Sequence, residues 1–175
     1  SLRTLQRCMH ETYVDCPFYE QLQYTMDSRA EILFTYYVAA DDRLARQCME
    51  SFRKTQRSDG ILQASAPAQG VNVMPGFSVF YHLMLPDHMM HFGDQSLVRD
   101  HFGCIDRVLE YFNGHLTPKG LVGSVGGVLF QHKYWSFVDW CEEWNDTIGV
   151  PAAGTVGDKS ITMESLVYLY GLRHA

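Results

Sequence analysis

Apolar residues recur with a helical period along most of the chain. From about residue 19 to residue 40 they form one stripe, which predicts a helix with this stripe toward a core, its members being Leu22, Met26, Ala30 and Leu33. A second helix is expected after Asp41 and Asp42, which would cap it, with an apolar face of Leu44, Cys48, Met49 and Phe52. A third strong stripe consists of Val98, Phe102, Ile105, Leu109 and Phe112. We predict further helices over residues 1–13 and 77–90, and from Ser160 or Thr162 toward residue 172.

The connections between these helices are of two kinds. Short breaks lie at Asp-Cys-Pro (15–17), Ser-Asp-Gly (58–60) and Gly-Asp (93–94), whereas residues 63–75 form a longer loop rich in Ala, Gly, Ser and Pro. The glycine-rich stretch at 120–130 predicts a hairpin or a long loop. Pairs of helices joined in this way are typical of a helical bundle, a solenoid or an α/α toroid. In a toroid, the long loops gather at one end and build the site.

Charge and composition exclude several classes of partner. The net charge is −6 and the isoelectric point is near 5.7, whereas a surface that binds phosphates needs a basic patch. No apolar run reaches the length that spans a bilayer. We therefore expect neither nucleic acid nor a membrane as a partner.

Cysteines and histidines give no sign of a metal or a disulfide framework. The five cysteines are dispersed without a CxxC pair, which favours reduced thiols and a cytoplasmic location. The chain starts with Ser, so a secreted or periplasmic origin stays open if a leader was removed. His82, His88 and His91 have no carboxylate at ligand spacing and are expected in the core or in loops. We expect no metal and no cofactor.

One acidic and aromatic stretch, VDCPFYEQLQYTMDSRAE (14–31), is the strongest candidate for chemistry. On a helix, Glu20, Tyr24 and Asp27 would lie within about 40° of one another, with the two acids roughly 10 Å apart. Such a row is compatible with a solvated helix face, with Asp15 as a simple N-terminal cap. It is equally what a sugar site needs, because carboxylates bind hydroxyls and one carboxylic acid can protonate a leaving oxygen.

Four short motifs resemble the bacterial α-L-rhamnosidases of glycoside hydrolase family 78. The first is Asp15-Cys16-Pro17 followed by Glu20, an aromatic at Tyr24, and Asp27. The others are QRSDGIL at 56–62, HFGD at 91–94 and FVDW at 137–140, and together they cover nearly all 175 residues. The resemblance implies an all-α fold, part of an (α/α)6 toroid, with a short β-like or loop insertion near 120–135. It also implies that residues 1–175 are the N-terminal portion of an inverting catalytic domain.

Site roles follow from the resemblance, residue by residue. Glu20 would be the general acid, and Asp15 and Asp27 would hold the rhamnose hydroxyls. Tyr24, in place of the family's Trp, would form part of the sugar wall, and Asp139 with Trp140 would close another side. Trp135, Trp140 and Trp144 suit core packing as well as sugar stacking, and we include Trp135 among the substrate-binding residues.

The chain departs from the family pattern at several positions. Tyr19 stands where the family usually has Arg, and Thr25-Met26 replaces Trp-x-Gly. The family's general base is a Glu well past the Asp-Trp motif, beyond residue 175. Glu142 and Glu143 are candidates for binding hydroxyls, not for the base. Glu164 is expected to be a first-turn charge of the last helix.

The leading hypothesis is hydrolysis of terminal α-L-rhamnosyl residues from plant glycosides or bacterial polysaccharides. Another (α/α)6 glycosidase with a different sugar remains an alternative, as does a non-catalytic carbohydrate-binding or scaffold domain. Half of a toroid would expose helix faces that a complete one buries, so the chain would be unstable alone or would pair with a copy of itself.

Overall fold

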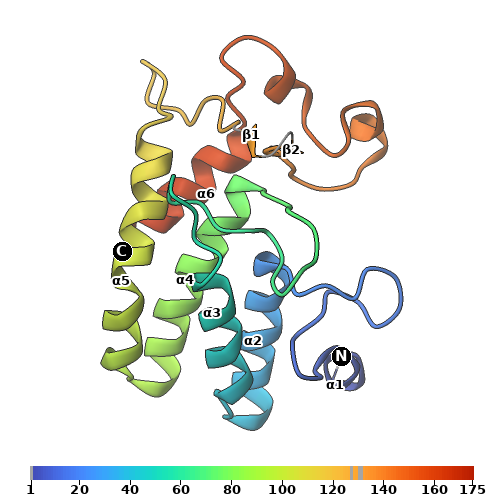
Figure 1. Cartoon of the computed structure of the whole chain (residues 1–175), viewed down its shortest axis with the longest axis vertical. Helices are drawn as coiled ribbons and strands as arrows, with labels where there is room; N and C mark the ends of the chain where they lie inside the picture. The colour runs from blue at the N-terminus through green and yellow to red at the C-terminus, as the bar shows by residue number, and fades with distance from the viewer. Residues whose placement is uncertain (1, 127, 130–131) are drawn as a thin grey trace.

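The fold of this chain is helical, as the sequence predicts. The computed structural model describes residues 2–126, 128–129 and 132–175 (Figure 1). Its elements are α1 (Leu2–Cys8), α2 (Thr25–Ala39), α3 (Arg43–Arg53), α4 (Pro75–Phe92), α5 (Gln95–Asn113), β1 (Val128–Leu129), β2 (His132–Lys133), the 3-10 helices η1 (Glu142–Thr147) and η2 (Ala152–Thr155), and α6 (Thr162–Leu172). The antiparallel pair β1–β2 falls within the insertion expected near 120–135; residues 127, 130 and 131 of that stretch lie outside the described part.

Helix α4 is the centre of the fold. Its sequence is apolar on all sides, and a helix of this kind must be buried all round. It packs against α2, α3, α5 and α6, and Figure 1 shows it between its neighbours. Pro75 occupies the start of α4, where the missing N–H costs nothing. Among the described residues, no helix is both long and apolar enough to cross a membrane.

Short turns and long loops lie at opposite ends of the helices. Ala40 and Gly93 adopt left-handed conformations that end α2 and α4, and α3 and α5 begin within three residues. The long connections 54–74 and 114–161 lie at the other end, where α2 and α4 begin (Figure 1). The predicted short break at 93–94 is therefore confirmed, whereas those at 15–17 and 58–60 lie inside the longer connections 9–24 and 54–74. The loops gather at one end.

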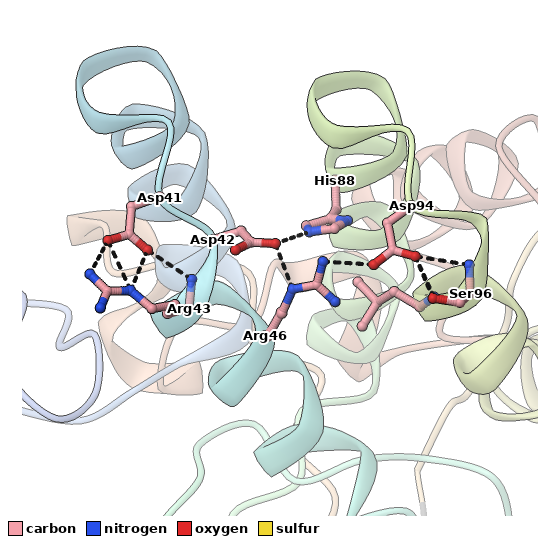
Figure 2. A network of polar contacts seen from close by, with 8 residues as sticks. Asp41, Asp42, Arg43, Arg46, His88, Asp94 and Ser96 are labelled. Carbon is pink, nitrogen blue, oxygen red and sulfur yellow. Dashed lines mark hydrogen bonds and ion pairs between the residues drawn. The ribbon is translucent and has the colours of Figure 1, made fainter.

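The two short turns are tied together by a network of charged side chains (Figure 2). Arg46 of α3 contacts both Asp42, with Nε 2.5 Å from Oδ2, and Asp94, with Nη2 2.6 Å from Oδ2. The buried His88 places Nε2 3.0 Å from the same oxygen of Asp42. Asp94 also caps α5, because its Oδ1 accepts the N–H of Ser96. The network fixes the α2–α3 turn against the α4–α5 turn, and both His82 and His88 lie in the core, as expected.

The predictions for α2 need correction. The helix begins at Thr25 rather than near residue 19, and Leu22 lies in the preceding loop. Its buried face is mostly polar and consists of Thr25, Ser28, Glu31, Ile32, Thr35 and Tyr36, whereas Met26 and Leu33 are half-buried and Ala30 is exposed. Some of these polar groups have partners; the Thr25 hydroxyl, for example, donates to the carbonyl of Phe77 at 2.9 Å. Others are buried without a hydrogen bond, namely Ser28 Oγ, Glu31 Oε2 and the hydroxyl of Tyr36.

Three smaller predictions also change. Asp42 is the N-cap residue of α3 but its side chain makes no capping bond; Asp41 accepts the N–H of Arg43 instead. The N-cap position of α6 is Ile161, not Ser160 or Thr162. Phe102 is half exposed, on the outer side of α5.

Glu164 differs most from its expected role. It does lie in the first turn of α6, but it is only 1% exposed and both carboxyl oxygens lack a hydrogen-bond partner. Its Cγ lies beside Gly76, 3.9 Å from where a Cβ would stand. Burial raises the pKa of Glu164 from 4.5 to about 7. The residue is a buried acid and not a solvated charge.

Replacing Glu164 by Gln should remove a pH-dependent loss of stability. The folded state favours the protonated form of Glu164. The contribution of Glu164 to the free energy of unfolding is therefore full below pH 4.5 and is lost as the pH rises through about 7. The loss amounts to on the order of 3 kcal/mol. In urea unfolding, the free energy of unfolding of Glu164→Gln should rise relative to that of the unmodified protein between pH 4.5 and pH 8.

The exposed Glu110 of α5 supplies the matched control. Glu110→Gln makes the same change of charge and should show no such gain. A stability difference between Glu164→Gln and the unmodified protein that stays constant with pH would contradict a buried, protonated Glu164.

Candidate active site

A cavity of about 400 Å³ opens at the loop end of the helices. It lies where α2 and α4 begin, and three segments line it: the loop before α2 together with the first turn of α2, the start of α4, and the residues after β2. The lining consists of Asp15, Glu20, Tyr24, Met26, Asp27, Met74, Phe77, Trp135, Phe137, Asp139 and Trp140. All seven residues predicted for the site, from both halves of the chain, therefore line one cavity.

The acids before α2 are placed by a closed loop and not by a helix. Two hydrogen bonds join Asp15 and Leu22. The N–H of Asp15 donates to the carbonyl of Leu22, and the N–H of Leu22 donates to Asp15 Oδ1, both at 2.9 Å. Gln21 adopts a left-handed φ of 54°, and its side-chain amide donates to the carbonyl of Pro17 at 3.0 Å. The expectation that Glu20, Tyr24 and Asp27 share a helix face is wrong, yet the loop brings all three to the same cavity.

Glu20 is held by Tyr24. The Tyr24 hydroxyl donates to Glu20 Oε2 at 2.7 Å, and the backbone N–H of Glu20 points to the sulfur of Cys16 at 3.3 Å. Burial raises the pKa of Tyr24, and the hydrogen bond to Glu20 raises it further. Tyr24 thus remains a donor, and it leaves the second oxygen of Glu20 free for other partners.

Asp27 lies deeper than Glu20, in the first turn of α2. Burial raises the pKa of the Asp27 carboxyl, and the charges of Asp15, Glu20 and Asp139 add to the effect. The backbone of α2 counteracts this in part, since the N-terminus of a helix favours an anion. Four carboxyl groups therefore surround the cavity, and none of its described lining residues is basic.

An aromatic wall faces the acids. Ring centroids follow one another from Tyr24 to Phe77 (6.3 Å), Phe77 to Phe137 (6.2 Å), and Phe137 to Trp135 (4.5 Å) and Trp140 (5.4 Å). Trp140 is 57% exposed and offers a free surface to a ligand. A wall of rings opposite carboxylates can bind the apolar and the hydroxyl-bearing sides of a pyranose together.

Hydrogen bonds anchor the wall to the rest of the chain. The N–H of Trp135 donates to the carbonyl of Val73 at 2.8 Å, and its indole donates to the carbonyl of Ile148 at 2.9 Å. The segment closes on itself where Val138 donates to the carbonyl of Gly149 at 3.0 Å. Gly149 has a φ of 72°, and a Cβ on it would lie 2.4 Å from Phe137 Cε2. Only glycine fits there without a shift of the ring.

Four lining residues are absent from the sequence-based site: Met26, Met74, Phe77 and Phe137. Phe137 belongs to the FVDW motif and could have been included on that signal, whereas the others carry only an apolar pattern. Conversely, Trp144, Glu142 and Glu143 lie in η1 outside the cavity lining. In the part of the chain that the structure describes, no group of three or more His, Cys, Asp or Glu side chains is arranged to hold a metal ion.

Comparisons with known proteins agree with this fold. Residues 1–171 match the sequence profile of the bacterial alpha-L-rhamnosidase six-hairpin glycosidase domain. The fold is similar to the GH78-family rhamnosidase of Bacillus sp. GL1 (TM-score 0.78, 22% identity, 98% of this chain and 16% of that one). It is also similar to a rhamnosidase from Klebsiella oxytoca with rhamnose bound (TM-score 0.76, 22% identity, 99% of this chain and 31% of that one). A search of curated proteins gave no significant match.

Gly149→Ala should disrupt the aromatic wall. The left-handed φ costs an L-residue about 1–2 kcal/mol, and the clash with Phe137 adds to this cost and displaces the ring. We expect a lower midpoint of thermal unfolding and a changed tryptophan fluorescence, because Trp135 and Trp140 both pack on Phe137.

Gly157→Ala separates the two effects, since Gly157 also has a positive φ of 57° but no atom within 4 Å of where a Cβ would stand. This control should lose stability without a change in fluorescence. Equal fluorescence spectra of both variants would show that Gly149 does not shape the wall.

Proposed function

The chain belongs to the bacterial α-L-rhamnosidase six-hairpin glycosidase family, and on this premise we propose that its cavity binds a terminal α-L-rhamnosyl residue and that Glu20 catalyses its hydrolytic release. The observation that carries the proposal is that all seven predicted site residues line one cavity. Because the structural neighbours are only 22% identical to this chain, they support the fold and not the substrate.

Glu20 is proposed as the general acid. The hydroxyl of Tyr24 occupies Oε2, so Oε1 carries the proton toward the glycosidic oxygen. As the bond between that oxygen and the anomeric carbon breaks, the proton passes to the leaving alcohol and a water molecule bonds to the anomeric carbon. The loop that Asp15 and Leu22 close keeps the acid in place without a contact to a basic side chain.

The other carboxylates would bind the sugar. Asp15 and Asp27 line the side of the cavity that α2 and the loop before it form, and they would accept hydrogen bonds from the rhamnose hydroxyls. Asp139, whose Oδ1 accepts the N–H of Trp140 at 2.7 Å, would do so from the opposite segment. Trp135, Trp140 and Tyr24 would cover the apolar side of the ring.

Inversion of the anomeric centre is part of the proposal. An inverting enzyme needs a general base about 6.5–9.5 Å from the acid, with room for the attacking water. We assign this role to none of the carboxylates in the cavity, since each has a proposed role in binding. We propose that the base lies past residue 175.

The chain spans 16% and 31% of the two structural neighbours, so the activity of the whole protein is a proposal. We place residues 1–175 in the N-terminal portion of a catalytic domain, with rhamnose-containing glycosides or polysaccharides as substrates. Homo-oligomerisation and a cytoplasmic location remain predictions. A carbohydrate-binding domain without catalysis is the alternative, and it shares the cavity but not the function of Glu20.

Glu20→Gln should strongly lower turnover of a natural rhamnoside and keep sugar binding. Loss of a general acid lowers kcat by about 10²–10⁴-fold on a natural rhamnoside, whose leaving alcohol needs the proton. An aryl α-L-rhamnoside with an activated leaving group should lose much less. Both substrates are to be assayed with the longest natural form of the chain, and binding of L-rhamnose is to be measured by calorimetry.

Glu110→Gln, on the outer surface of α5, serves as the control and should keep full activity. Rhamnose binding with no turnover of either substrate by the unmodified protein would favour the binding domain. Equal turnover by Glu20→Gln and the unmodified protein would remove Glu20 from the mechanism.

A further inference from the structure

A second, smaller cavity of about 250 Å³ adjoins the candidate active site. Asp15 and Asp27 line both cavities, so these two carboxylates stand between them. The remaining lining comes from α1 and from α2, and consists of Thr4, Leu5, Cys8, Ala30, Glu31 and Phe34. We call this space the side cavity. Glu31 has no place in the proposed reaction.

Glu31 is a buried acid without a partner. It follows Asp27 by one helical turn, so both side chains lie on the same face of α2. The residue is 9% exposed, and its Oε2 is fully buried with no hydrogen bond. Burial raises the pKa of Glu31 from 4.5 to about 8, and the charges of Asp27 and Asp15 contribute to the rise.

The three carboxyls of the side cavity differ in what stabilises their anions. Asp15 accepts the N–H of Leu22 at 2.9 Å. Asp27 lies in the first turn of α2, where backbone N–H groups favour a negative charge. Glu31 lies one turn further along the helix and has neither form of support. When three neighbouring carboxyls hold one proton, that proton goes to the group whose anion is least stabilised.

The other groups that face Glu31 do not compete for this proton. Cys8 of α1 and Cys48 of α3 are buried thiols, and burial raises the pKa of each above the ordinary value of 9.0. Tyr13 is buried as well, and burial raises its pKa to about 12. No basic side chain lines the described side cavity. Among Glu31 and these three groups, Glu31 is therefore the one whose pKa burial brings into the neutral range, to about 8.

We propose that Glu31 is a positioning residue, which stays uncharged in the side cavity and thereby keeps Asp15 and Asp27 in place as acceptors for the hydroxyls of the substrate. The proposal rests on the proposed function, since it concerns binding of the same sugar. Once Glu31 loses its proton, a third negative charge in the side cavity repels the two acceptors and draws in water. The acceptors then leave the geometry that binds the sugar.

The experiment compares the unmodified protein with Glu31→Gln, a neutral side chain of the same shape, between pH 6 and pH 9.5. Calorimetry gives the Kd of L-rhamnose, and assays with an activated aryl α-L-rhamnoside give KM and kcat. This substrate needs little protonation, so ionisation of Glu20 contributes little to its pH profile. Glu31→Leu is a second neutral variant in case Glu31→Gln does not fold, and Glu110→Gln is the control for the change in net charge.

For the unmodified protein and for Glu110→Gln, we expect Kd and KM to rise about tenfold above pH 8, as for a coupling of one pKa unit, with little change in kcat. For Glu31→Gln, Kd and KM should match those of the unmodified protein at pH 6–7 and stay constant up to pH 9.5. A merely structural Glu31 would leave the pH dependence of the two proteins alike.

The same rise in Glu31→Gln as in the unmodified protein, or a flat profile in the unmodified protein, would overturn the proposal while the rhamnosidase function stands. Absence of rhamnose binding and of turnover by the unmodified protein at every pH would overturn the proposed function and this inference with it.

Discussion

Burial of α4 is the constraint on which the rest of the structure depends. A helix that is apolar on every side can be stable only when neighbours cover it all round. Here α2, α3, α5 and α6 provide the cover. The short turns at Ala40 and Gly93 lead into α3 and α5, and both of these helices pack against α4. Because α2 and α4 run in the same direction, their first turns lie together at the loop end. This is where the acids of the first loop meet Met74 and Phe77.

The pKa values of carboxyl groups shift in opposite directions at the two ends of the helices. At the short turns, hydrogen bonds from Ser96 and Arg46 lower the pKa of Asp94, and the network of Figure 2 stabilises ions. At the loop end no basic side chain lines the described cavity, and burial raises the pKa of Asp27 and Glu31. Paired charges fix the fold at one end, whereas the acids at the other end have no basic partner among the described lining residues and leave oxygens free for a ligand.

The polar inner face of α2 connects these two properties. A purely apolar face would pack as well against α4, but it could not place Asp27 and Glu31 beside the cavities. The cost is a buried carboxyl without a partner at Glu31, which the fold tolerates because the group can remain neutral. Glu164 shows the same solution at the start of α6.

The sequence by itself determined the helical class and identified seven residues that line one cavity, because periodicity and local motifs depend on neighbours along the chain. The stripe of Cys48, Met49 and Phe52 is buried as predicted, since α3 is apolar on one side only. Tertiary structure decided the rest. Helix α2 starts at Thr25 because Asp15 and Leu22 close a loop before it. Its core face can be polar because residues of other segments bond to Thr25 and Thr35, and because Glu31 can remain neutral. The burial of Glu31 and Glu164 likewise depends on helices distant in sequence, and no local pattern records desolvation by residues that only the fold brings near.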